Sequence, residues 1–238
     1  MRLPQFENAG RPACIGQCLP TDAVRLDDTR FAVVRVEEFF TEVSAYALSE
    51  YLASGLEYER DEIDDQKRTN RAVRIGDLPD SPFKMHRQPD SLAEAALNVF
   101  AGPWFVSQLE TWLGAPLRIL RPMTPYRLDP GDYISPHDDR AAPEFRLSVS
   151  CSLTPAKAGS KGGETVVGLV DKVEEYEHPD FFFPLKRWSL KPGSRALMPM
   201  FNSVLLITLT DSYAHAVREV GCAPRYSITT LYGDRQAA

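Results

Sequence analysis

Long apolar runs, a strong charge of one sign and abundant cysteine are all missing from this 238-residue sequence. No stretch approaches the roughly 20 consecutive apolar residues that a membrane-spanning helix needs. Residues 1–7 lack the apolar run of a secretory signal. The net charge is −6, and lysine and arginine form no stripe that would suit a phosphate backbone. We therefore expect a cytoplasmic protein without a membrane or nucleic-acid partner.

Cysteine is scarce, with four residues at positions 14, 18, 151 and 222. An even number is compatible with disulfides, but a chain of this size without an export signal does not favour a disulfide scaffold. Cys14 and Cys18 have the spacing of a metal-binding pair, yet no second Cys/His pair follows at zinc-finger distance. We expect four free thiols, with those of Cys151 and Cys222 buried.

The composition is that of an ordinary globular protein. Its apolar share of 43% is enough for a proper core, and its length fits one large domain. Residues 1–28 are rich in proline, glycine and aspartate and show no sustained period, so they are expected to form an N-terminal arm. Residues 29–238 are then expected to form a single domain.

Helix signals dominate the first part of this domain, and strand signals dominate the rest. Thr41 can cap a helix, Ser91 and Glu94 form a capping box, and residues 104–113 read as a further helix. Short alternating segments then follow at 117–120, 125–128, 133–135, 146–153, 164–170, 196–198, 203–209 and 226–232. This order predicts a mainly β fold, in which N-terminal helices support a jelly-roll core at about residues 117–233.

A histidine and a carboxylate stand two residues apart after a Pro-Gly turn, in His137-Asp138-Asp139. Residues two apart in a strand project from one face, so His137 and Asp139 would point at one position, whereas Asp138 would point away unless a kink exchanged the two. With a second histidine they would complete the facial triad of non-haem iron sites. His215, which follows the apolar segment 203–209, is our choice for that ligand, and a buried structural histidine is the alternative.

An arginine and a serine stand ten and twelve residues after His215. Arg225 and Ser227 begin a predicted strand and share a face. A guanidinium grips a carboxylate through two parallel bonds, and a hydroxyl nearby can add a third. This suits a dicarboxylate such as 2-oxoglutarate, whose keto-acid end can chelate iron. His86 and His178 lack such partners and are expected at the surface, with His178 a minor candidate for the pocket rim.

Several motifs stand in a fixed order along the chain: Tyr126, Gly131-Asp132-Tyr133, His137-Asp138-Asp139, Arg146, Gly162-Gly-Glu-Thr165, Lys191-Pro-Gly193, His215-Ala-Val217 and Arg225-Tyr-Ser227. In this order they resemble the Fe(II)/2-oxoglutarate dioxygenases of the prolyl-4-hydroxylase-like branch. The resemblance implies a double-stranded β-helix fold. It also implies an enzyme that converts 2-oxoglutarate and O2 into succinate and CO2 while it hydroxylates an unactivated carbon.

The resemblance also implies site residues. Fe(II) would be bound by His137, Asp139 and His215, and 2-oxoglutarate by Arg225 and Ser227. Tyr126 would lie near the co-substrate, with a core tyrosine as the alternative. Halogenating relatives replace the carboxylate by a small residue, so the aspartate argues against halogenation.

The chain departs from the family pattern in two places. Serines at 148, 150 and 152 stand where many relatives have a tyrosine that contacts 2-oxoglutarate, so a serine or another residue must supply that contact. A long segment, 171–189, contains Phe181-Phe182-Phe183 and separates two of the motifs. We expect the aromatic triplet to pack in the core, with a role as a lid over the site as the alternative.

The substrate is expected to be a small molecule, such as an amino acid or a biosynthetic intermediate. A peptidyl, prolyl-type substrate is the alternative. An amino acid would need an arginine for its carboxylate, and Arg71, Arg74, Arg140 and Arg187 are the candidates. A non-catalytic metal-binding jelly roll and a zinc hydrolase are less favoured. A zinc hydrolase would have no role for Arg225. A jelly roll that had lost its enzymatic activity would have no need to keep this arginine.

Overall fold

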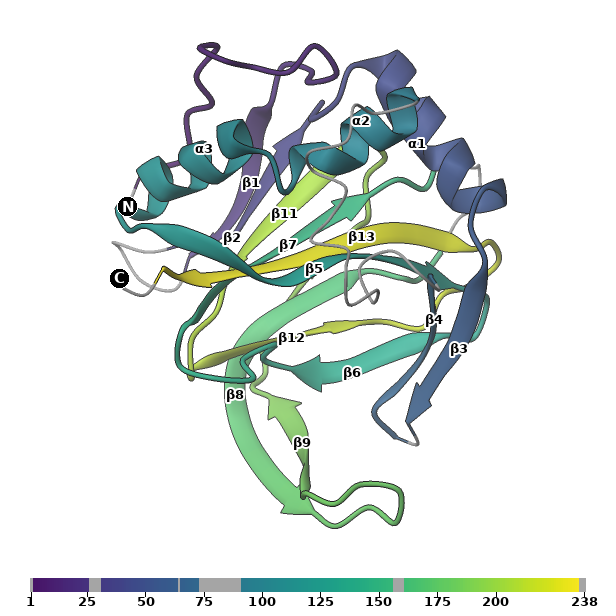
Figure 1. Ribbon diagram of the computed structural model, residues 1–238. Helices are drawn as coiled ribbons and strands as arrows, with labels where there is room; N and C mark the ends of the chain where they lie inside the picture. Colours follow the sequence, from purple (N-terminus) through teal and green to yellow (C-terminus); the bar gives the residue numbers. More distant parts are fainter. Residues whose placement is uncertain (1, 26–30, 64, 73–90, 156–160, 236–238) are drawn as a thin grey trace.

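The computed structural model describes residues 2–25, 31–63, 65–72, 91–155 and 161–235 (Figure 1). The helices are α1 (Glu42–Ser54), α2 (Leu92–Val99) and α3 (Pro103–Leu113). The strands are β1 (Leu19–Arg25), β2 (Phe31–Glu37), β3 (Tyr58–Ile63), β4 (Lys67–Ala72), β5 (Leu117–Leu128), β6 (Tyr133–His137), β7 (Phe145–Ser152), β8 (Thr165–Tyr176), β9 (Leu185–Leu190), β10 (Arg195–Leu197), β11 (Ser203–Thr208), β12 (Tyr213–Val217) and β13 (Arg225–Asp234). None of the described helices is long and apolar enough to cross a membrane.

The strands form one antiparallel sheet that folds over into two layers (Figure 1). The first layer, in the order β1-β2-β11-β7-β13-β5, lies beneath the three helices. The second layer runs β6-β12-β8-β10, and β4 joins the two because it pairs with both β5 and β6. The predicted class, a mainly β jelly roll supported by N-terminal helices, is confirmed.

The helix boundaries follow from local sequence signals. The Thr41 side chain accepts a hydrogen bond from the Ser44 backbone N–H at the start of α1. Ser91 caps α2 by accepting from the Glu94 backbone N–H, and Gly114 ends α3 with a φ of 69°. The capping roles predicted for Thr41 and Ser91 are confirmed.

The main hydrophobic core lies between the helices and the first layer. Phe39, Phe100 and Phe105 are fully buried, with ring centroids 5.4 to 5.6 Å apart. Tyr232 of β13 packs against Phe105, and its hydroxyl donates to the Phe100 carbonyl. This aromatic cluster fixes the helices on one face of β13 and leaves the other face toward the second layer.

The N-terminal segment packs onto the domain. Residues 1–28 were expected to form an extended arm that lies on the domain or is partly disordered, and within it Leu19–Arg25 forms β1 and pairs with β2. Cys14 and Ile15 are buried in the main core. The segment therefore contributes to the sheet and the core, and the boundary between an arm and the domain stays a prediction.

The segment 171–189 forms the outer part of a hairpin, β8–β9, which projects below the two layers (Figure 1). Phe182 is fully exposed and Phe183 is 60% exposed, so the prediction that this triplet packs in the core is wrong for both.

All four cysteines are free thiols, as expected, and Cys151 is buried. Cys222 is exposed, contrary to the prediction, because it lies in the turn before β13.

Candidate active site

Two neighbouring strands bring the predicted histidines together. His137 ends β6, His215 lies in the middle of β12, and the two are direct cross-strand partners. Their ring centroids are 4.3 Å apart. Because directly opposed residues of an antiparallel pair project to the same face, both imidazoles enter one cavity between the layers.

The Asp139 side chain also points toward the two histidines, but the alternation of side chains along a strand does not explain its direction. β6 ends at His137, and Asp139 lies beyond it with a φ of 55°, a left-handed conformation that aspartate tolerates better than most residues. Its Oδ1 lies 3.4 Å from His137 Nε2, and its Oδ2 lies 3.3 Å from His215 Nε2. Asp138 accepts a hydrogen bond from the Arg140 backbone N–H instead. A kink therefore brings Asp139, the expected carboxylate, to the two imidazoles.

The electrostatics of these three side chains suit a bound cation. Their ligand atoms all lie within 4.8 Å of one another. Burial alone would raise the pKa of Asp139, but the two imidazoles hold it well below its usual range. Burial, and then the neighbouring His137, lower the pKa of His215, which favours the neutral form that binds a metal.

A backbone contact fixes the tautomer of His137. Its Nδ1 lies 2.9 Å from the Ser135 carbonyl oxygen, which can only accept a hydrogen bond. In the neutral ring Nδ1 therefore carries the proton, which leaves the Nε2 lone pair to bind a metal, as in metal-binding histidines generally. Burial alone would lower the pKa of His137, but the Asp139 carboxylate raises it. Two imidazoles and one carboxylate fit Fe(II), which this donor set binds with positions left open for other ligands.

At the other end of the cavity lies a buried cation. Arg225 and Ser227 both line the cavity and are each 5% exposed. Burial lowers the pKa of Arg225 to about 10. Its Nη2 lies 3.4 Å from Thr165 Oγ1, whereas Nε and Nη1 have no hydrogen-bond partner in the described part of the chain. Because unpartnered buried donors cost free energy, the guanidinium is suited to an anionic ligand such as a carboxylate.

The Gly162-Gly163 pair explains how Thr165 reaches this arginine. Gly162 has a φ of 78°, and a Cβ there would lie 2.1 Å from the Glu219 carbonyl oxygen. Gly163 has a φ of 71°, and a Cβ there would lie 3.4 Å from the Arg225 Cδ. The close approach at Gly162 requires glycine, and the positive φ of Gly163 favours it, so the motif lets the start of β8 pass beside the loop between β12 and β13.

Hydroxyl groups cover the cavity-facing side of the first layer. Tyr126 lines the cavity and is the cross-strand partner of Ser227. Burial, followed by the nearby Asp139 carboxylate, raises the pKa of Tyr126 to about 12, so its phenol stays protonated. Ser148 and Ser150 line the same cavity from β7. Serines thus lie where many relatives of the resembled family are expected to carry a tyrosine.

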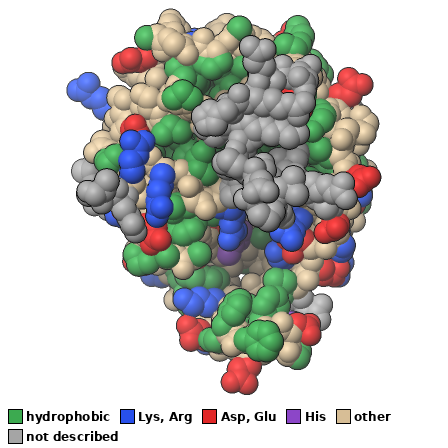
Figure 2. All heavy atoms as spheres, in the orientation of Figure 1, with side chains coloured by type: hydrophobic (Ala, Val, Ile, Leu, Met, Phe, Trp, Pro, Cys, Tyr) green, Lys and Arg blue, Asp and Glu red, His purple; other side chains and the backbone are tan. Residues whose placement is uncertain are grey.

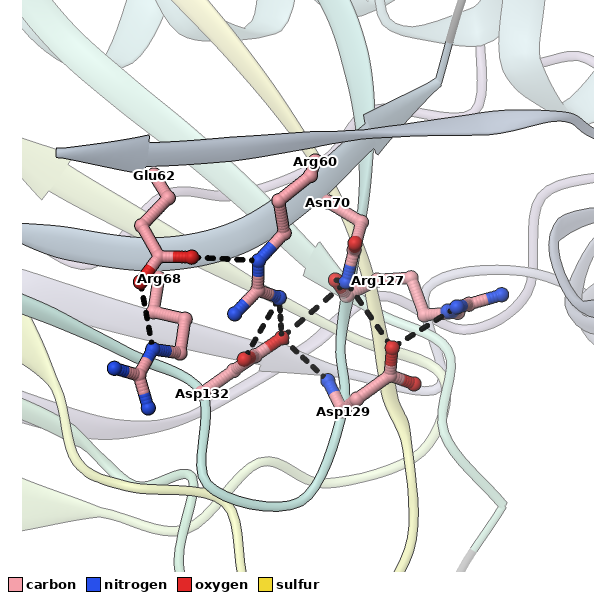
Figure 3. Close-up of polar contacts among 7 residues, drawn as sticks. All are labelled: Arg60, Glu62, Arg68, Asn70, Arg127, Asp129 and Asp132. Atoms are coloured by element: carbon pink, nitrogen blue, oxygen red, sulfur yellow. Dashed lines mark hydrogen bonds and ion pairs between the residues drawn. The ribbon is translucent and has the colours of Figure 1, made fainter.

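A buried carboxylate holds the turn that precedes β6 (Figure 3). Asp132 is 2% exposed and accepts hydrogen bonds from Arg60 Nη1 at 2.9 Å, Asn70 Nδ2 at 3.2 Å and the Asp129 backbone N–H at 2.9 Å. Its own carbonyl accepts from the Val220 N–H at 2.9 Å. The turn is thereby tied both to the β3–β4 hairpin and to the loop between β12 and β13. The Asp-Pro-Gly-Asp pattern in the sequence predicted a turn, but it did not indicate that Asp132 would bond to residues in distant segments.

The arginines considered for a substrate carboxylate lie in different places. Arg140 and Arg187 each form an ion pair with an aspartate. Arg71 of β4 is the cross-strand partner of Tyr126. Arg74 lies outside the described residues.

Of the two remaining histidines, only His178 lies in the part of the chain that the structure describes, and it is not part of the triad. His86 lies outside the described residues. His178 lies in the β8–β9 hairpin, where its ring packs against Phe181 with centroids 5.2 Å apart. It is not among the residues that line the cavity. On the surface, a histidine is visible in a hollow with Lys or Arg side chains beside it (Figure 2).

Comparisons with known proteins agree with this geometry. The sequence matches no family model and no curated protein. Among solved structures, it is similar to an oxidoreductase of the 2OG-Fe(II) oxygenase family from Burkholderia pseudomallei, with 20% identity, 87% of each chain covered and a TM-score of 0.55. A prolyl-4-hydroxylase from Pseudomonas putida is similar at 13% identity, covering 86% of this chain and 93% of its own, with a TM-score of 0.58.

A third similar structure is the non-heme alpha-ketoglutarate-dependent epimerase SnoN from nogalamycin biosynthesis. It has 13% identity, a coverage of 85% of this chain and 76% of its own, and a TM-score of 0.52. The chain therefore has the fold of the 2-oxoglutarate/Fe(II) oxygenases, as the resemblance in sequence implied. Its His-Asp-His group lies within this fold.

Proposed function

We propose that the protein is an Fe(II)- and 2-oxoglutarate-dependent oxygenase. His137, Asp139 and His215 would hold the iron, and Arg225 with Ser227 would hold the distal carboxylate of the co-substrate. One observation carries the proposal: a three-residue cation site and a buried guanidinium with two unpartnered nitrogens line the same cavity. A zinc hydrolase or a metal-binding protein without turnover would use the first feature and leave the second without a role.

The residues of the chain would orient the reactants. Bound iron with its keto acid supplies oxygen activation and the removal of hydrogen from carbon, and succinate and CO2 are released. Arg225 fixes the far end of 2-oxoglutarate through charge-assisted bonds. Ser227 and Tyr126 line the same cavity as this arginine and the triad. His137, Asp139 and His215 would hold the iron through three protein ligands, a donor set that leaves room for other ligands.

The proposal also includes the class of substrate. We assign hydroxylation of an unactivated carbon in a small molecule, such as an amino acid or a biosynthetic intermediate. The net charge of −6 and the similarity to an epimerase from nogalamycin biosynthesis support a small molecule. A peptidyl, prolyl-type substrate is the second candidate, and the similarity to the Pseudomonas putida prolyl-4-hydroxylase favours it.

An anaerobic titration tests the enzyme class. Metal-free protein is titrated with Fe(II) and then with 2-oxoglutarate, and the visible charge-transfer band of an iron-chelated keto acid is recorded. We expect the band in the wild type and its loss in His215→Ala. We also expect a chelator to abolish succinate release, and Fe(II) with a reductant to restore it better than Zn(II). Iron binding without the band would contradict the proposal.

A further inference from the structure

Three rows of directly paired residues cover the cavity-facing side of the first layer. Each row crosses β5, β13 and β7 in that order, and the rows are Tyr126–Ser227–Ser152, Thr124–Thr229–Ser150 and Arg121–Leu231–Ser148. At least one member of every row lines the cavity. Directly paired residues project to the same face of a sheet. The third row therefore places Arg121 on the cavity side.

A register shift in β5 produces this placement. From Thr124 to Arg121 the strand advances by three residues, while β13 advances by two, from Thr229 to Leu231. Simple alternation would send Arg121 to the same side as Met123, which is buried in the core beneath the helices. The additional residue reverses the alternation, as β-bulges do, and turns the arginine toward the cavity.

A second arginine reaches the same region from β4. Arg71 is the cross-strand partner of Tyr126, whose other partner is Ser227. Burial and then Asp139 raise the pKa of Tyr126, and both Arg121 and Arg71 lie close enough to oppose that rise. Both arginines are exposed, in contrast to Arg225.

Arg121 is available to bind a ligand. Its side chain makes no ion pair or hydrogen bond with any other residue among those that the structure describes, whereas Arg60, Arg140 and Arg146 are each paired with an aspartate. A guanidinium fork matches the two oxygens of a carboxylate. In a protein with a net charge of −6, cations at a cavity mouth also raise the local concentration of anions.

We propose that Arg121, assisted by Arg71, binds the carboxylate of the primary substrate at the mouth of the cavity. The substrate class is then a small carboxylic acid of the amino-acid type. This assignment rests on the proposed oxygenase function and deepens it. Arg225, buried at the other end, serves the co-substrate, so the two anions have separate arginines.

Substrate-stimulated succinate release tests the assignment. The iron-loaded protein with 2-oxoglutarate is offered the twenty common L-amino acids and, in parallel, the carboxamide of each. We expect at least one acid to raise succinate release above the uncoupled rate and its carboxamide to have no effect. Arg121→Gln and Arg71→Gln should each raise the KM for that acid at least about tenfold, which corresponds to about 1.4 kcal/mol. The KM for 2-oxoglutarate should stay unchanged.

Arg118→Gln is the matched control, because this exposed arginine lies on the same strand and donates to the Asp234 carbonyl. It should leave both KM values unchanged. Stimulation by the carboxamides, or by no acid at all, overturns the carboxylate site if the charge-transfer band still forms. A change in the KM for 2-oxoglutarate in Arg121→Gln overturns it as well. Absence of the band overturns the oxygenase function instead, so the two failures are distinguishable.

Discussion

His137 and His215 face each other directly across β6 and β12, with ring centroids 4.3 Å apart. Their meeting depends on strand register, because a slip by one residue would turn one imidazole to the opposite face of the sheet. The register of β6 is supported by the turn before it, where Asp132 is bonded to the β3–β4 hairpin and to the loop between β12 and β13. The metal site therefore depends on contacts made well outside it.

The two neighbouring aspartates should behave differently when they are replaced. Asp139→Ala should weaken Fe(II) binding by more than about 100-fold, since even changes outside the ligand set cost up to about that factor. Asp138→Ala should retain most of the affinity, because that side chain bonds to the Arg140 backbone instead. Anaerobic Fe(II) titration measures both. The reverse order of effects would show that Asp138 is the ligand.

Replacement of Arg225 should affect the co-substrate and not the metal. Arg225→Ala should raise the KM for 2-oxoglutarate about 100-fold or more, because loss of a buried charged partner costs about 3 kcal/mol. The Fe(II) affinity should stay within about threefold. Arg218→Ala is the control, since this exposed arginine lies seven residues earlier, beyond β12. An unaltered requirement for 2-oxoglutarate in Arg225→Ala would refute the assignment.

The buried Asp132 should contribute to stability and to the metal site together. Asp132→Asn places an amide against the donors of Arg60 and Asn70 and should lower the free energy of unfolding by about 2 kcal/mol. It should also weaken Fe(II) binding in protein that remains folded. Glu62→Gln alters only exposed ion pairs and should change stability by less than about 1 kcal/mol. Equal effects of the two variants in urea unfolding would contradict this role of Asp132.

Replacement of Phe182 in the β8–β9 hairpin and of Phe39 in the core should have very different effects on stability. Phe182→Ala should change the free energy of unfolding by less than about 0.5 kcal/mol, because the side chain is fully exposed. Phe39→Ala should cost about 3 to 5 kcal/mol, since its ring is fully buried among other aromatics. Chemical denaturation measures both. A large loss in Phe182→Ala would mean that the hairpin tip packs against the protein in solution.

Local spacing indicated two pairs of residues that line the cavity of the candidate site. His137 and Asp139 lie two residues apart, and so do Arg225 and Ser227, so a single strand or a single kink determines how each pair points. The helix caps at Thr41 and Ser91 could also be predicted, because each depends on a residue only three positions along the chain. The fold class followed from the order of helix and strand signals.

Long-range register could not be read from the sequence. The pairing of Asp132 with Arg60 spans 72 residues. Arg121 was not considered, because it lies between the predicted segments 117–120 and 125–128 and because a register shift in β5 determines which face of the sheet it joins. The phenylalanine triplet was expected in the core because aromatic residues are usually buried, but the hairpin carries two of its members into solvent. Each of these outcomes depends on a partner or an irregularity far from the residue concerned.

The left-handed backbone at Asp139 makes this position a strained one for any residue that has a side chain. An L-residue in this conformation bears a steric cost of roughly 1 to 2 kcal/mol, which glycine does not. Asp139→Gly would therefore remove the carboxylate and relax the backbone in the same step, with the gain offset by about 1 kcal/mol for the greater freedom of the unfolded chain. Opening the coordination sphere at this position would cost the contacts between the carboxylate and the two imidazoles, but it would not strain the backbone.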